Sequence, residues 1–217
     1  MKGDETLPPG VGYFGKLLST NAQGELLCDI EAVIKHAPLY LPTMPRTGKP
    51  FSVWMTNCGT LGWVSDKDGG YRYQGMHPIT GERWPNIPEC LLTVWDKVTQ
   101  GAPAPEACLV NVYGPKARLG SHVDRDEEDL SQPVVSISLG DTASFHVGGK
   151  RRSDAKCRAL LTSGDVVVLA GEARLLYHGV DRVYSGTSDL CPRHGRINLT
   201  LRRVNWPYAG PEPVTGG

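Results

Sequence analysis

The chain has 217 residues and carries 23 Lys and Arg against 23 Asp and Glu, so its formal net charge is zero. This length supports one domain with a substantial core, and the balanced charge gives no direct sign of a nucleic-acid-binding surface. No segment approaches the roughly 18 consecutive apolar residues of a membrane span, and residues 1–10 lack the apolar run of a secretory signal.

These exclusions predict a cytoplasmic protein without membrane contact. No heptad pattern or exposed apolar helix requires a partner, so we expect a monomer. The cysteines form no C-x-x-C pair, which predicts reduced thiols and argues against a zinc knuckle. The six cysteines are Cys28, Cys58, Cys90, Cys108, Cys157 and Cys191.

The N-terminal half predicts two helices. Apolar residues recur at helical spacing in residues 20–36, where Thr20 or Asn21 is a candidate cap and Pro38 prevents extension. Residues 88–99 show a second apolar helical face. We expect the remaining segments to be an irregular proline-rich connection (37–50), a strand (51–55) and a Gly- and Asp-rich loop (59–75).

From Cys108 onward, short β-branched or alternating segments are separated by turns. This pattern is typical of an antiparallel sandwich or jelly roll behind a helical N-terminal part. We therefore expect one compact unit with an N-terminal extension (1–106), a β core (107–204) and a flexible tail (205–217). The predicted strands are 108–113, 134–139, 143–147, 165–170, 174–180 and 196–204.

A metal site is the first candidate for chemistry. His122 and Asp124 stand two residues apart, so an extended backbone points both side chains to the same side. His178 would complete two histidines and one carboxylate, the facial triad of non-haem Fe(II) oxygenases, with positions left for co-substrate and O₂. An isolated H-x-D is more often a turn histidine beside a solvated carboxylate, and His146 is a competing ligand on spacing alone.

An anion pocket is the second candidate. In the last strand, Arg196, Asn198, Thr200 and Arg202 share one face by alternation. If that face is buried, two guanidiniums require an anion, and a dicarboxylate could pair with both. The alternative is an exposed polar face with solvated arginines. In the earlier strand, Asn111 and Tyr113 offer a similar polar face.

The order of these motifs resembles one family. The segments NVY, LGSHVDRDE, VVSISLG, SGDVVVLAGEARLLYHGV and RINLTLRR follow one another as in the AlkB family of 2-oxoglutarate dioxygenases, and WMTNCGTLGW upstream is similar too. The resemblance spans about Phe51 to Val204. It implies a mainly β, double-stranded β-helix (jelly-roll) core, with a helical N-terminal extension that covers the substrate.

The resemblance also implies residue roles. It assigns His122, Asp124 and His178 to Fe(II), and so favours His178 over His146. It assigns Arg196 and Arg202 to the two carboxylates of the co-substrate 2-oxoglutarate. The other residues that it places in the co-substrate pocket are Asn111, Tyr113 and Asn198.

On the substrate side, the resemblance implies oxidative demethylation of bases such as 1-methyladenine and 3-methylcytosine in single- or double-stranded DNA or in RNA. Trp63 matches an aromatic that stacks on the flipped base, and Asp126 an acidic residue beside it. Tyr71 matches a tyrosine near the substrate phosphate, and Arg152 a nearby basic residue. Phe51 stands where the family has a methionine, so the pocket wall should differ.

Without the resemblance, ordinary packing explains the aromatic residues and solvation explains Asp126. Three basic runs are candidate contacts for the nucleic-acid backbone, although solvated surface explains them equally well: Lys150–Arg152, Lys156 with Arg158, and Lys116 with Arg118. The rival functions are hydroxylation of a small molecule, demethylation of a protein side chain, and a jelly-roll binding module without catalysis.

Overall fold

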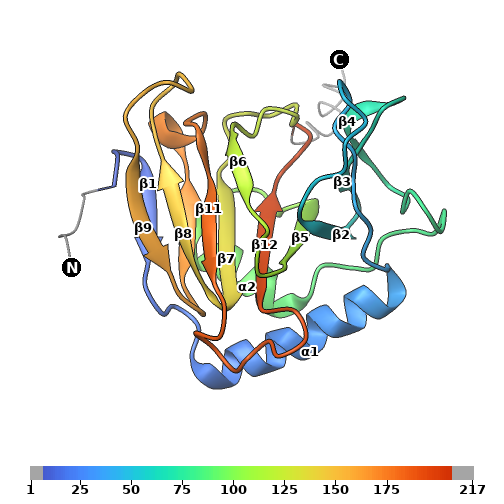
Figure 1. Ribbon diagram of the computed structural model, residues 1–217, viewed down its shortest axis with the longest axis horizontal. Helices are drawn as coiled ribbons and strands as arrows, with labels where there is room; N and C mark the ends of the chain where they lie inside the picture. Colours follow the sequence, from blue (N-terminus) through green and yellow to red (C-terminus); the bar gives the residue numbers. More distant parts are fainter. Residues whose placement is uncertain (1–6, 207–217) are drawn as a thin grey trace, which may run out of the picture.

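The computed structural model describes residues 7–206, and within them two antiparallel sheets form a jelly roll (Figure 1). The two sheets pack face to face. One apolar cluster between them contains Val134 and Val167 of the larger sheet and Phe145 and Leu161 of the smaller. The larger sheet has the order β1 (Val11–Phe14), β10 (Val166–Leu169), β7 (Val134–Gly140), β12 (Arg196–Arg202), β5 (Ala107–Tyr113), β2 (Trp54–Gly59).

The smaller sheet has the order β6 (Leu119–His122), β11 (His178–Tyr184), β8 (Thr142–Val147), β9 (Cys157–Leu161). A separate hairpin, β3 (Gly62–Asp66) with β4 (Gly70–Gln74), stands at the opposite side of the molecule from β9 in Figure 1. We call it the lid hairpin. The mainly β architecture predicted from the sequence is therefore confirmed.

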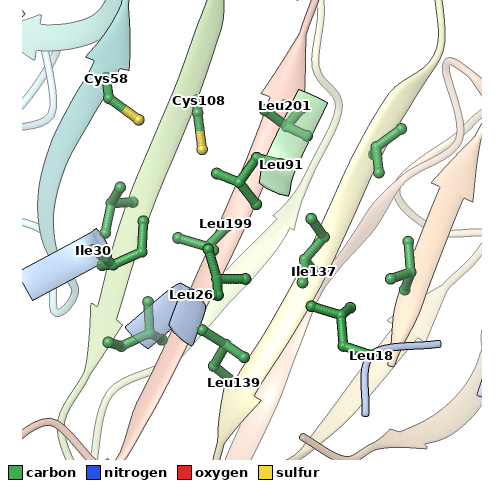
Figure 2. Close-up of a cluster of buried hydrophobic side chains, with 14 of the residues drawn as sticks. Leu18, Leu26, Ile30, Cys58, Leu91, Cys108, Ile137, Leu139, Leu199 and Leu201 are labelled. Carbon is green, nitrogen blue, oxygen red and sulfur yellow. The ribbon is translucent and has the colours of Figure 1, made fainter. Parts of the chain in front are cut away.

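Two helices, α1 (Thr20–His36) and α2 (Glu89–Thr99), cover the outer face of the larger sheet. Their apolar faces pack on alternate residues of the strands, such as Leu26 and Leu91 with Leu199 (Figure 2). Cys58 and Cys108 also lie in this cluster, paired in register between β2 and β5. Burial of this apolar area is the main driving force for the fold.

Strand alternation then turns the polar residues of β12 inward. Ile197, Leu199 and Leu201 contact the helices, whereas the intervening residues face the smaller sheet. All seven residues of β12 are buried, and the strand is hydrogen-bonded to β5 on one side and β7 on the other. The interpretation of this polar face as an exposed surface is therefore wrong.

Several predicted boundaries are also wrong. Residues 59–75 contain the whole lid hairpin rather than a loop, because the turn at 67–69 closes two short pairing segments. The strand expected at 51–55 begins at Trp54. The strand expected at 174–180 begins at His178, because the short 3₁₀ helix η1 (Gly171–Ala173) precedes it. β1, β6 and β9 were not predicted.

The helix predictions hold with small changes at the ends. The N-cap of α1 is Ser19, whose side chain accepts a hydrogen bond from Ala22 N, rather than Thr20 or Asn21. The flexible tail is expected at residues 205–217, and its residues 207–217 lie outside the described part of the chain. Within residues 7–206, no helix is both long and apolar enough to cross a membrane.

Candidate active site

One cavity of about 680 Å³ opens between the two sheets and beneath the lid hairpin. Its wall includes every residue to which the family resemblance assigned a role with metal, co-substrate or substrate. These are His122, Asp124, His178, Asn111, Tyr113, Arg196, Asn198, Arg202, Trp63, Tyr71, Asp126 and Arg152. Residues far apart in the chain therefore share one chamber.

A cluster suited to a metal ion lies in this cavity. His122 ends β6, Asp124 follows it, and His178 begins β11 directly opposite, in register with His122. The ligand atoms of the three residues lie within 4.8 Å of one another. His122 Nε2 is 3.7 Å from Asp124 Oδ1, and His178 Nε2 is 3.8 Å from Asp124 Oδ2. Two imidazoles and a carboxylate suit Fe(II) and leave coordination positions open.

The protonation states also suit a metal. Burial, and then the nearby His122, lower the pKa of His178 to about 4, so this imidazole is neutral at pH 7. Burial favours the neutral form of Asp124, but Arg202 and the two histidines outweigh it and hold its pKa well below the usual range. Each histidine Nδ1 contacts a backbone oxygen two residues earlier, at Gly120 (2.9 Å) and Leu176 (3.0 Å), leaving Nε2 for a metal.

The competing histidine, His146, lies elsewhere. It belongs to β8, on the face of the smaller sheet that points away from the cavity. Its Nε2 is 3.1 Å from Ser121 Oγ, and its Nδ1 is 2.9 Å from Asp181 Oδ1. Among the residues described, the structure thus brings His178 rather than His146 to the pair His122 and Asp124.

A deep basic position is formed by Arg196, which is 0% exposed. Its Nη1 donates to Asp141 O (3.0 Å) and its Nη2 to Ser138 Oγ (2.8 Å), whereas Nε has no hydrogen-bond partner. Burial lowers the pKa of this guanidinium. No carboxylate within residues 7–206 forms an ion pair with it, so an anionic ligand would compensate its buried charge.

Arg202 occupies a second buried position, beside the metal cluster. Its Nη2 donates to Asp124 Oδ2 at 3.0 Å, and its Nε lies 3.2 Å from Glu127 Oε1. Burial opposes the charge, but these two carboxylates outweigh it and raise the pKa of Arg202 above its usual value. Its Nη1 has no partner, nor has the buried Asn111 Oδ1. Among the described residues, the cavity therefore keeps a free donor at Arg202 and a free acceptor at Asn111 for a further ligand.

The lid hairpin supplies an aromatic wall. Trp63 of β3 and Tyr71 of β4 are stacked, with ring centroids 5.6 Å apart and an interplanar angle of 21°. Trp63 Nε1 donates to Asp126 Oδ2 at 2.8 Å. The rings of Phe51 and Trp63 pack edge to face, with centroids 6.1 Å apart. The position that departs from the family pattern therefore contacts the stacking residue. Arg152 lies over the ring of Tyr177, 5.7 Å from its centroid.

A buried network that the sequence analysis missed connects the lid hairpin to the metal cluster. Tyr73 of β4 donates to Glu127 Oε1 at 2.6 Å, and Arg174 Nη2 donates to Glu127 Oε2 at 2.9 Å. Arg174 Nη1 also donates to the backbone oxygen of Asp124 at 2.7 Å. Glu127 stands in the acidic run DRDEED, which resembles a solvated surface, so nothing in the sequence singles it out.

Comparisons with known proteins agree on the kind of fold and chemistry. Residues 10–202 match the family model described as "2OG-Fe(II) oxygenase superfamily". The chain is 48% identical over 199 residues to the "Alpha-ketoglutarate-dependent dioxygenase AlkB homolog" of Caulobacter vibrioides, covering 92% of this chain and 90% of the relative.

Two further proteins are similar. The "DNA N(6)-methyladenine demethylase ALKBH1A" of Arabidopsis thaliana is 48% identical over 119 residues, which cover 46% of this chain and 34% of that protein. The solved structure of OsALKBH1 superposes with a TM-score of 0.79 at 30% identity, covering 92% of this chain and 99% of that chain.

Proposed function

The chain belongs to the 2OG-Fe(II) oxygenase superfamily, and from this we propose that it oxidatively removes alkyl groups from nucleobases. It is an Fe(II)- and 2-oxoglutarate-dependent dioxygenase. The observation that carries the substrate proposal is the stacked pair Trp63 and Tyr71, held beside a carboxylate at the mouth of the cavity that contains the metal cluster.

His122, Asp124 and His178 are the proposed iron ligands. Support comes from their mutual distances, from the neutral state of His178 and from the ionised state of Asp124. Bound iron, with O₂ and 2-oxoglutarate, supplies the oxidation of an N-methyl carbon, which leaves as formaldehyde while 2-oxoglutarate becomes succinate and CO₂. The protein's own task is to orient both ligands and to exclude water.

Arg196 and Arg202 are the proposed partners of the two carboxylates of 2-oxoglutarate. Both guanidiniums are buried, and each has an N–H without a partner. Arg202 lies beside Asp124, so it would receive the end of the co-substrate next to the iron, and Arg196 would receive the other end. Guanidinium pairs suit this task because they bind carboxylates with fixed geometry. Asn111, Tyr113 and Asn198 would complete the pocket.

The lid hairpin is the proposed site for the base. Trp63 would stack on a flipped base, and the negative charge of Asp126 favours a cationic one, such as 1-methyladenine or 3-methylcytosine. Such bases pair poorly, so they cost little to extrude from a duplex and are accessible in single strands. Tyr71 and Arg152, both exposed at the cavity wall, would contact the flanking phosphates.

A nucleic-acid substrate is further supported by the relative named as a DNA demethylase. Backbone contacts would come from exposed basic residues near the cavity, such as Arg118 and the run Lys150–Arg152. The proposed substrate is a methylated base in either DNA or RNA. Because the chain has no net charge, we expect binding to depend on these local residues and to weaken as salt increases.

The test is demethylation of a defined lesion. The protein is loaded with Fe(II) and 2-oxoglutarate without oxygen, and is then exposed to air with a single-stranded DNA oligonucleotide carrying one 1-methyladenine. Mass spectrometry should show loss of the methyl group, and His122→Ala should show none. If 2-oxoglutarate is consumed while DNA and matched RNA oligonucleotides stay methylated, the proposal of a nucleic-acid substrate is wrong.

A further inference from the structure

A chain of polar contacts crosses the outer face of the smaller sheet, close to the metal cluster; Ser121 at its end also borders the cavity, whereas His146 and Asp181 do not. Ser121 Oγ of β6 lies 3.1 Å from His146 Nε2 of β8, and His146 Nδ1 lies 2.9 Å from Asp181 Oδ1 of β11, within ion-pair distance but outside hydrogen-bond geometry. Arg158 of β9 then donates to Asp181 Oδ2 at 3.1 Å. His146 is 2% exposed, so its two ring nitrogens face these partners rather than solvent.

The contact between Ser121 and His146 spans one intervening strand, because β11 lies between β6 and β8. The residue of β11 in register with His146 is Gly179. A Cβ at Gly179 would lie 3.0 Å from His146 Cε1 and 2.5 Å from Leu119 O. The absence of a side chain there lets the imidazole pass over β11 and reach the neighbouring strand.

β6 needs such an attachment, because its backbone pairing is weak. It is a four-residue edge strand, and only His122 and Leu119 have registered partners in β11, with an irregularity between them. The His122 ring is oriented through Gly120 O, two residues earlier on the same strand. The position of the ring therefore depends on the backbone on both sides of Ser121.

The other two proposed ligands do not share this dependence. His178 begins β11, which is paired on both sides. Asp124 is held by Arg202 and, through its backbone oxygen, by Arg174. His122 alone stands on the weakly paired edge strand, with a side chain 34% exposed.

We propose that Ser121, His146 and Asp181 are positioning residues that hold β6, so that His122 meets the metal in ligand geometry. They touch neither metal nor substrate and act through His122 alone. This inference rests on the proposed metal site. Partners outside the ligand shell typically change metal affinity by about 10- to 100-fold when they are removed.

The test measures metal affinity rather than turnover. Mn(II) alone is titrated into metal-free protein, and the free ion is followed by electron paramagnetic resonance. Ser121→Ala and His146→Phe should raise the Mn(II) dissociation constant about tenfold. Ser121→Thr and His146→Gln keep side chains able to hydrogen-bond between positions 121 and 146. Their Mn(II) dissociation constants should stay close to that of the wild type. Ser144→Ala, on the same face two residues from His146, is the matched control.

Circular dichroism establishes that each variant is folded. If His146→Phe does not fold, Ser121→Ala decides, since it removes one oxygen from a half-buried residue. A dissociation constant for Ser121→Ala equal to that of the wild type overturns the inference. The proposed metal site is tested separately: if wild-type protein does not bind Mn(II), or His122→Ala binds it as well, that site is wrong and the inference falls with it.

Discussion

Arg202 and Asp124 form a buried ion pair, with Nη2 of the arginine 3.0 Å from Oδ2 of the aspartate. The carboxylate proposed as an iron ligand is thus already bound to the arginine proposed to hold 2-oxoglutarate. One contact keeps Asp124 ionised and fixes its orientation before either ligand arrives. The metal cluster and the co-substrate pocket therefore form one electrostatic unit.

Replacing Arg202 should destabilise the fold as well as the site. In Arg202→Met, the buried Asp124 loses its guanidinium partner and the buried Glu127 keeps only Arg174, and breaking a buried pair typically costs about 3–5 kcal/mol. Urea denaturation of the metal-free protein would measure this loss. The control is Arg151→Met, whose ion pair with Asp154 lies on the surface, so its loss should change the free energy of unfolding far less. Equal losses in the two variants would contradict the prediction.

Arg196→Lys should weaken 2-oxoglutarate binding selectively. A lysine keeps the charge, but its one nitrogen cannot replace Nη1, Nη2 and Nε, which contact Asp141 O, Ser138 Oγ and the ligand from three separate positions. We expect the KM for 2-oxoglutarate to rise about tenfold, which corresponds to about 1.4 kcal/mol. Succinate formation at varied 2-oxoglutarate measures it. An unchanged KM would exclude a role for Arg196 in the pocket, and the exposed Arg83→Lys, outside the cavity wall, is the surface control.

Asp126→Asn should change selectivity between bases. The substitution removes the negative charge beside the stacking residue but keeps an oxygen that can accept from Trp63 Nε1. The ratio of kcat/KM for cationic 1-methyladenine to that for neutral N6-methyladenine should fall about tenfold, as expected for loss of one charge-assisted contact. Competition between two oligonucleotides, read by mass spectrometry, gives this ratio directly. A ratio that does not change would sink the proposed role of Asp126.

Tyr73→Phe should loosen the lid hairpin. The hydroxyl of Tyr73 makes a 2.6 Å hydrogen bond to the buried Glu127, and its loss leaves that carboxylate one donor short, at a cost of about 1–3 kcal/mol. Hydrogen exchange of the amides in residues 62–74 should become faster than in wild-type protein. Tyr71→Phe is the matched control, since Tyr71 is 50% exposed on the same hairpin. Equal exchange in the two variants would show that Tyr73 does not anchor the lid.

The metal-free protein should lose stability in mild acid. The folded-state pKa of His178 is lowered to about 4, so between about pH 6.5 and pH 4 the unfolded chain binds the extra proton. The free energy of unfolding therefore has its full value, as far as His178 is concerned, above about pH 6.5. It falls by up to about 3 kcal/mol as the pH decreases towards 4. Denaturation at a series of pH values would follow this loss. His178→Asn should flatten the slope, whereas the exposed His36→Asn should not.

The sequence predicted the chemistry of the site better than its boundaries. Alternation along residues 196–202 correctly placed four polar side chains on one face, because a period of two is dictated by the strand itself. Burial of that face was undetermined, since it depends on the helices α1 and α2 covering the opposite face. The spacing of His122 and Asp124 suggested a ligand pair, but the partner histidine required the family resemblance.

Other features depend on tertiary contacts that no local pattern reveals. β6 is recognisable only through its pairing with β11, and the lid hairpin resembles a Gly-rich loop until its two arms are aligned. Glu127 and Arg174 appear as surface charges in the sequence, yet their mutual ion pair is buried. His146 was a rival ligand in the sequence because the amino-acid pattern of a strand does not show which of its two faces points into the cavity.

Cys58 and Cys108 are free cysteines that occupy neighbouring positions on β2 and β5, and their place in the fold separates them from the proposed iron site. Both thiols, together with Cys191, belong to the apolar cluster between the larger sheet and the helices, whereas the proposed iron site lies on the other side of that sheet. The backbone of the sheet thus separates these three thiols from a centre that handles O₂, although the thioethers of Met44 and Met55 line the cavity itself. The strands that shape the pocket therefore also keep these three thiols away from it.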